Sequence, residues 1–182
     1  MAQFKAFSPD VQVNGEAILA VVNAMNYGIA TRKEILHKNG LKNVQPGQWY
    51  EQQQWLNTFK EIHDVLGPST LFMIGRAIPE HAKFPPEVND LQKALTALDM
   101  AYKMNHKGGN IGYYKLQHFD ASKRQATMEC KNPYPCEFDR GIILTMLRKF
   151  RPQDSFKYDV ILDATQETRL GGGDSCTYRI EW

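Results

Sequence analysis

The residues of this chain with the most distinctive chemistry are its three cysteines, Cys130, Cys136 and Cys176. Cys130 ends an expected strand, Cys136 lies at the start of an expected helix, and Cys176 begins the last expected strand. If these strands share a sheet, the thiols converge, and His106 or His118 could complete a zinc site. A thiolate at a helix N-terminus also favours redox chemistry. Because no Cys-x-x-Cys pair occurs, core packing is the simplest interpretation, with zinc binding and redox sensing as alternatives.

The common catalytic motifs are missing from the sequence. There is no GxxxxGK[ST], GxGxxG, HExxH or GxSxG segment, so phosphate, dinucleotide, zinc-protease and serine-hydrolase sites lack their usual support. The run Gly171–Gly173 precedes a strand, which predicts a flexible turn. The carboxylates considered as acid or base candidates occupy expected polar positions: Asp99, Glu129, Glu137 and Asp139. The sequence therefore names no catalytic residue, and enzymatic activity is not favoured.

Large aromatic and apolar side chains are more numerous in the helical half than a minimal core requires. Such side chains are typical of the lining of a pocket for a small molecule, although stripes at helical spacing also form ordinary cores. The residues expected to line such a pocket are Trp55, Phe59, Phe72, Leu98, Tyr102, Tyr114, Phe138 and Ile142.

Periodicity divides the chain into a helical half and a half rich in strands. Apolar spacing and capping signals predict helices over residues 15–27, 31–39, 55–66, 69–74 (a short one) and 88 to about 107, with His106 in the last turn of the final one. The period then changes, which predicts strands over 111–119 and 126–131, a helix over 138–150, and strands over 158–162 and 176–182. We therefore expect one α+β domain over residues 1–182, with a helical layer (about 1–109) before an antiparallel β-β-α-β-β sheet unit (about 110–182).

Composition excludes several classes of protein. The 182 residues include 22 Lys and Arg against 20 Asp and Glu, a net charge of +2, which is too balanced for a nucleic-acid-binding surface. No apolar run approaches the roughly 20 residues that span a bilayer, and residues 1–10 do not resemble a secretory signal. An odd number of cysteines does not suggest a disulfide framework. These features predict a cytoplasmic protein without a membrane span.

Two segments of the second half resemble a known family. Cys136-Glu-Phe-Asp-Arg-Gly141 before an amphipathic helix, and Gly171-Gly-Gly-Asp-Ser-Cys176 before the last strand, resemble the ending of 4-vinyl reductase-type small-molecule-binding domains. That fold is similar to those of haem nitric-oxide/oxygen-binding domains and Golgi-transport tethering subunits. The resemblance implies a non-enzymatic sensory or regulatory domain that binds an apolar ligand between its helices and its sheet and serves a signalling or transcriptional partner. The alternative it implies is a homodimeric interaction or scaffold protein.

Haem is a further possibility that the resemblance raises. A haem-binding relative would place a proximal histidine after a Leu-Asp pair, whereas Leu98-Asp99 is followed here by Met100, Ala101 and Tyr102, with His106 one turn later. The Tyr-x-Ser-x-Arg motif that holds haem propionates is replaced by residues 129–133. Because tyrosine can ligate haem iron, a haem-based gas sensor with Tyr102 as an atypical ligand is retained as an alternative.

Overall fold

The structure, a computed structural model, describes residues 3–25 and 28–182. It confirms the expected α+β class, with helices first and a β-β-α-β-β unit last. The helices are α1 (Gly15–Asn23), α2 (Ile29–Lys38), α3 (Gln52–Leu66), α4 (Pro68–His81), α5 (Leu91–Asn105) and α6 (Cys136–Phe150). The strands are β1 (Gln12–Asn14), β2 (Trp49–Glu51), β3 (His106–Lys107), β4 (Tyr113–Asp120), β5 (Gln125–Lys131), β6 (Asp159–Leu162) and β7 (Cys176–Glu181).

The first two helices have different bounds from those expected. Helix α1 ends at Asn23, and residues 26 and 27, the end of the expected helix, lie outside the described residues. Helix α2 begins at Ile29, directly after Gly28, whose φ of 69° is left-handed. Glycine adopts this conformation at little cost, so the chain turns before the expected capping box at residues 31–34. That prediction of the helix start was wrong.

Helix α4 is much longer than the short helix expected, because it runs for 14 residues and includes Pro79. It begins directly after Gly67, with Pro68 in its first turn, where a missing backbone N–H costs nothing. At Gly75 an added Cβ would lie 2.2 Å from the Phe138 carbonyl oxygen of α6. The two backbones therefore cross in direct contact, and this crossing places Phe138 beside α4.

The second half forms a four-stranded antiparallel sheet in the order β4-β5-β7-β6. Alternating residues of β5 and β7 are buried on one face: Ala126, Met128, Cys130, Cys176, Tyr178 and Ile180. Cys130 is the register partner of Cys176 on the neighbouring strand. The expected convergence of these strands in one sheet is confirmed.

A second sheet, which the sequence did not predict, has the strand order β2-β1-β3. Its strands have only two or three residues, too few for an alternating pattern to be recognised. In this sheet Val13 pairs with His106, which follows the last residue of α5 and has extended backbone angles. His106 is therefore held by a strand pairing, and its expected place on the last turn of a helix was wrong.

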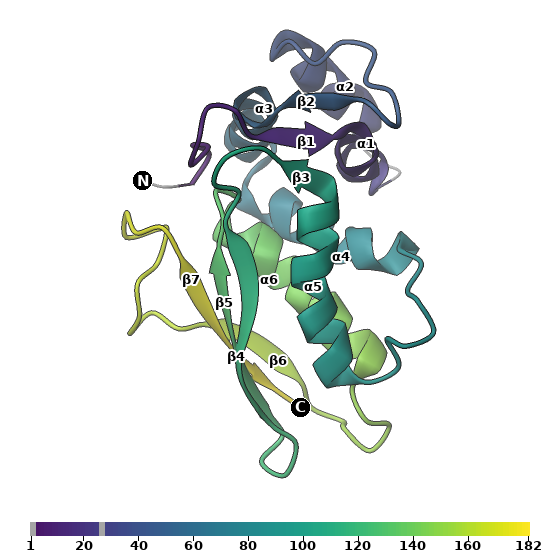
Figure 1. The fold of residues 1–182 in the computed structure, drawn as a ribbon, viewed down its shortest axis with the longest axis vertical. Helices are drawn as coiled ribbons and strands as arrows, with labels where there is room; N and C mark the ends of the chain where they lie inside the picture. The colour runs from purple at the N-terminus through teal and green to yellow at the C-terminus, as the bar shows by residue number, and fades with distance from the viewer. Residues whose placement is uncertain (1–2, 26–27) are drawn as a thin grey trace.

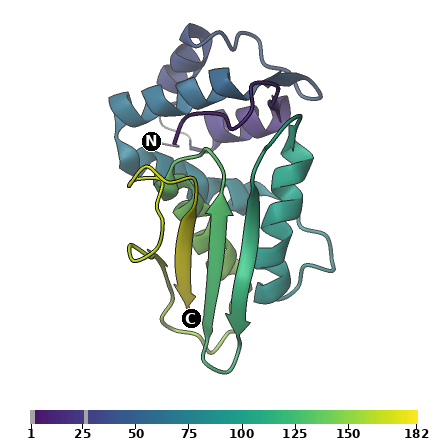
Figure 2. The same cartoon turned by 60° about the vertical axis from the view of Figure 1, so that its left-hand side comes forward.

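Figures 1 and 2 show the four-stranded sheet as one layer, with α5 and α6 on the same side of it and the N-terminal helices and short strands at one end. Buried apolar residues from Val13 to Trp182 form one hydrophobic cluster between these parts. Within the described ranges, no helix is both long and apolar enough to cross a membrane.

Candidate functional site

A cavity of about 320 Å³ lies where the helices meet the sheet. Its walls are mostly apolar and come from α1, α3, α4, α5 and α6, together with residues of β4 and of the β5–α6 connection. Seven of the eight expected pocket residues line it: Trp55, Phe59, Leu98, Tyr102, Tyr114, Phe138 and Ile142. The volume is near the lower end of the range for small-molecule sites. That these residues bind a ligand stays a prediction.

Phe72 is the expected pocket residue that lies elsewhere. It precedes Pro79, a cavity residue of α4, by two helical turns, or about 10 Å along the axis. Its ring stacks under the guanidinium group of Arg140, 4.4 Å from the ring centroid. The helical periodicity identified the correct face of α4, but it could not show which turn of that face meets the cavity.

Edge-to-face aromatic contacts hold one wall of the cavity. The ring of Phe59 lies 4.7 Å from that of Trp55, 5.0 Å from that of Phe138 and 5.3 Å from that of Tyr134, measured between centroids. These angles and distances are favourable for aromatic pairs. Because Phe59 is completely buried and contacts all three rings, it fixes their relative positions.

The cavity has a polar end formed by His106 and Tyr134. His106 Nδ1 lies 2.9 Å from the Tyr102 carbonyl oxygen, which can only accept, so this nitrogen carries the proton. Nε2 therefore accepts from the Tyr134 hydroxyl over 2.7 Å. Burial lowers the pKa of His106 to about 4, which keeps the imidazole neutral at pH 7. The site thus has one fixed tautomer with both ring nitrogens bonded.

A second polar group lies near this end without a partner. The side chain of Gln52 approaches the hydroxyls of Tyr102 and Tyr134. Neither its amide nitrogen nor its amide oxygen meets hydrogen-bond geometry, although the residue is 1% exposed. A buried polar atom without a partner costs about 1–3 kcal/mol. A hydrogen-bond partner placed next to the Gln52 amide would therefore stabilise the folded protein.

Behind Tyr114 lies a fully buried ion pair between Asp139 of α6 and Arg169. Arg169 Nη2 donates to Asp139 Oδ2 over 2.6 Å, and the Asn132 amide donates to the same oxygen over 3.1 Å. The Tyr114 hydroxyl donates to Asp139 Oδ1 over 2.5 Å. Burial, and then the charge of Asp139, raise the pKa of Tyr114, so this donor stays protonated. The network fixes Tyr114 in the cavity wall.

Sequence reasoning missed this network and placed Asp139 at an ordinary polar position. A signal was present, because Asp139 lies three residues after Cys136 and four before Ile143, on the buried face of α6. A carboxylate on an apolar face needs a buried partner. Nothing in the local pattern of the irregular segment after β6 identifies Arg169 as that partner.

The cysteines converge, but among the described residues they are not joined by His106 in a group that could hold zinc, the alternative considered above. The Sγ atoms of Cys136 and Cys176 are 2.6 Å apart, and Arg169 Nε donates to Cys176 Sγ over 3.3 Å. The guanidinium places a positive charge where a metal ion would bind, while both nitrogens of His106 bond to other groups. In residues 3–25 and 28–182 no group of three or more possible ligands could hold a metal ion.

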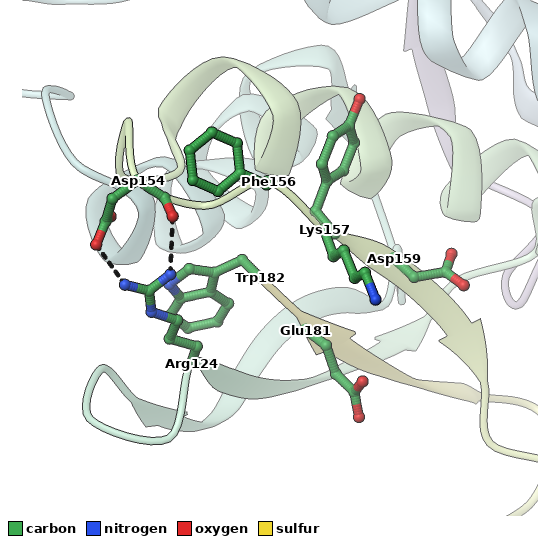
Figure 3. A pocket seen from close by; sticks show the side chains of 8 residues that line it. Arg124, Asp154, Phe156, Lys157, Asp159, Glu181 and Trp182 are labelled. Carbon is green, nitrogen blue, oxygen red and sulfur yellow. Dashed lines mark hydrogen bonds and ion pairs between the residues drawn. The ribbon is translucent and has the colours of Figure 1, made fainter.

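A larger, more open pocket of about 530 Å³ lies beside the β4–β5 turn and Trp182 (Figure 3). Charged side chains form much of its rim, including Arg124, which pairs with Asp154. The ring of Phe156 at its edge is 89% exposed. This pocket contains none of the eight expected residues and lacks enclosed apolar walls, so the cavity between helices and sheet is the stronger candidate.

Haem does not fit the cavity as its residues are placed. Of the described residues that line it, only Glu16 carries a charge at neutral pH, and a negative charge would repel the two haem propionates. Iron would need the lone pair of His106 Nε2, which accepts from Tyr134, or the hydroxyl of Tyr102, which donates to the Ile111 carbonyl oxygen over 2.5 Å. Both candidate ligands are therefore bonded to other groups.

Comparisons with family models and with curated proteins found no match. Solved structures do match over nearly the whole chain. An H-NOX protein from S. oneidensis, solved in its Fe(II)NO state, is 13% identical with a TM-score of 0.64, over 92% of this chain and 96% of that one. An oxygen-binding H-NOX domain related to soluble guanylate cyclases is 17% identical with a TM-score of 0.66, over 92% and 94%.

A third structure, described in a study of haem redox potential and porphyrin distortion, is 17% identical with a TM-score of 0.65, over 93% of this chain and 99% of that one. At these identities the likeness concerns the backbone and shows the fold alone. The fold expected from the order of helices and strands is confirmed: this chain has an H-NOX-like fold, with a mostly apolar cavity where the helices meet the sheet.

Proposed function

We propose that the protein is a non-enzymatic sensory or regulatory domain that binds an apolar small molecule in the cavity between helices and sheet. The observation that carries this proposal is the cavity itself, which has aromatic and aliphatic walls and one polar end at His106 and Tyr134. An apolar pocket with a few convergent polar groups is the usual form of a small-molecule site. The H-NOX-like fold supports a role in ligand binding.

The lining defines the chemistry of the proposed ligand. An uncharged ligand is favoured, because the described lining offers no cation, and its one anion, Glu16, lies on an exposed turn of α1. A hydroxyl group on the ligand would be complementary to the polar end, because the Tyr134 hydroxyl donates to His106 and its oxygen can still accept a hydrogen bond. The proposed ligand is thus small, neutral and mostly apolar, with one hydrogen-bonding group.

The proposed function includes transmission of the binding event to a partner. The cavity is lined by five helices and by Tyr114 of the sheet, so an occupant would contact all of these elements at once. The resemblance of residues 136–141 and 171–176 to 4-vinyl reductase-type domains supports a signalling or transcriptional partner. The odd number of cysteines, all three of them free and buried, supports a cytoplasmic location, in which thiols stay reduced.

A neutral fluorescent probe, N-phenylnaphthylamine, tests the proposal. Its emission rises when it enters an apolar cavity, so titration of the full chain should give saturable binding. Ala101 is exposed on α5 but lines the cavity, and Ala101→Trp should block the site and weaken binding at least tenfold. Met100→Trp is the matched control, because Met100 is 65% exposed and does not line the cavity. Equal binding by both variants, or no saturable binding, would contradict the proposal.

A further inference from the structure

The pair Cys136 and Cys176 is not used by the proposed ligand site. Cys136 is the first residue of α6, and Cys176 is the first residue of β7, 40 positions later. Their sulfur atoms lie 2.6 Å apart, and both residues are at most 1% exposed. Two thiols held this close need no large backbone movement to form a covalent bond.

The surroundings of the two sulfur atoms differ, which gives them different reactivity. Cys176 Sγ accepts hydrogen bonds from Arg169 Nε over 3.3 Å and from the Arg169 backbone N–H over 3.4 Å. The hydrogen bond from Cys136, and then Arg169, lower the pKa of Cys176 to about 6 despite burial. The pKa of Cys136 is raised, first by its hydrogen bond to Cys176 and then by burial. At neutral pH, Cys176 is therefore the thiolate and Cys136 the thiol.

We propose that Cys136 and Cys176 form a site of reversible oxidation, at which a peroxide converts the two thiols into an intramolecular disulfide bond. The reaction needs a two-electron oxidant that is small enough to reach a buried sulfur atom, and hydrogen peroxide is such an oxidant. Cys176 is the attacking group, and Cys136 is the resolving thiol.

Atoms and electrons balance in two steps. The Cys176 thiolate attacks one oxygen of hydrogen peroxide, the O–O bond breaks, and the departing hydroxide takes a proton to become water, which leaves a sulfenic acid. The Cys136 sulfur then attacks the Cys176 sulfur, the S–O bond breaks, and the hydroxyl leaves with the Cys136 proton as a second water. Two thiols are oxidised by two electrons, and one peroxide is reduced to two waters. A dithiol such as dithiothreitol reverses the reaction by exchange.

The oxidant reaches Cys176 through the irregular segment between β6 and β7. Arg169 of this segment covers the sulfur, and turns closed by Gly171 and Gly173 onto Thr168 follow it. Leu170, the next residue, is 60% exposed, so this segment reaches the surface of the molecule. Local opening of a surface segment of this kind needs less free energy than global unfolding.

Cys130 offers a matched control, because it is equally buried and lies opposite Cys176 in the register of β5 and β7. Burial, and then the charge of Asp139, raise the pKa of Cys130, so it is not poised as a thiolate. No hydrogen bond joins Cys130 to Arg169 among the contacts of the described residues. Of the three possible pairs of cysteines, the geometry therefore favours disulfide formation between Cys136 and Cys176.

Intact-mass measurement on the full chain, after hydrogen peroxide and without reductant, tests the proposal. The expected result is the loss of two hydrogen atoms, a cross-link between the peptides that contain Cys136 and Cys176, and full recovery with dithiothreitol. Cys130→Ala should give the same cross-link, whereas Cys136→Ala should stop at a sulfenic acid on Cys176 that dimedone traps. A cross-link through Cys130, or folded wild-type protein that keeps three thiols, would overturn the proposal.

The pH profile provides a second test that needs no variant. The groups around the pair are Cys130, Asp139, Arg169 and Tyr178. Burial raises the pKa of Cys130 and of Tyr178, so neither group should change its charge between pH 7 and pH 9. A thiolate with a pKa of about 6 is already ionised at pH 7, so oxidation at pH 9 should be less than about twofold faster. An increase of about 20-fold, as for an unassisted thiol, would refute the assignment of Cys176 as the attacking group.

Discussion

The ion pair between Asp139 and Arg169 gives the sharpest prediction of stability, through the substitution Asp139→Asn. The new side chain has nearly the same shape and can still accept the hydrogen bond from Tyr114, but it lacks the negative charge. Arg169 then stays buried with an uncompensated positive charge, since both side chains are 0% exposed. Removing one partner of a buried pair costs about 3–5 kcal/mol, which is a large part of the total stability of a domain, roughly 5–15 kcal/mol.

The matched control is Asp154→Asn, which breaks the exposed pair between Arg124 and Asp154 (Figure 3). Its side chains are 40% and 67% exposed, so water replaces the lost interaction, and the expected loss is at most about 1 kcal/mol. Urea unfolding followed by tryptophan fluorescence measures both variants. A loss below about 1 kcal/mol for Asp139→Asn, or equal losses in the two variants, would refute the structural reasoning.

Two further predictions concern the helix crossing and the buried histidine. In Gly141→Ala the new Cβ would lie 2.3 Å from the Phe72 carbonyl oxygen, so α4 and α6 must separate, at a cost of about 1–3 kcal/mol in the free energy of unfolding. Gly171→Ala, whose nearest neighbour is 3.3 Å away, should change that energy by less than about 0.5 kcal/mol, and equal losses in urea unfolding would contradict the crossing. The pKa of His106 is about 4 when folded, against about 6.5 unfolded. The unfolded chain therefore binds the proton first, and stability falls by about 3 kcal/mol as the pH drops from 7 to 4. His106→Gln should remove this part of the acid sensitivity, and unchanged sensitivity would show that another group causes it.

A titration with haem tests the conclusion that the cavity residues do not fit that group. We expect no Soret band that depends on His106 or Tyr102, because both candidate ligands are already bonded to neighbouring groups. A stoichiometric Soret band that is lost in His106→Gln would show that Tyr134 yields its hydrogen bond to iron, and that the H-NOX-like fold here carries haem.

The sequence predicted the arrangement of elements well, because periodicity reports which face of a helix or strand is buried. The alternation of β5 and β7 identified the face that carries Cys130 and Cys176. Prediction from periodicity failed where the apolar spacing does not determine the length or the type of an element. Helix α4 runs seven residues past its expected end at residue 74 and includes Pro79, and β1 to β3 are too short to show any period.

The candidate site was predicted in part for the same reason. Aromatic residues at helical spacing, such as Trp55 and Phe59, had to face the interior, and the interior encloses the cavity. The polar groups depended on tertiary pairing instead. Arg169 is 30 residues from Asp139, and Tyr134 is 28 residues from His106, so no local pattern could join them.

Occupation of the cavity by a neutral, mostly apolar molecule can be observed by NMR on isotopically labelled protein. With bound N-phenylnaphthylamine, we expect nuclear Overhauser effects between the probe and the side chains of Phe59, Tyr134 and Ile142, which line the cavity from α3, the β5–α6 connection and α6. We also expect these effects to be lost in Ala101→Trp. Contacts confined to Phe156 and Trp182 would place the probe in the open pocket at the end of the sheet and contradict the proposed binding in the cavity.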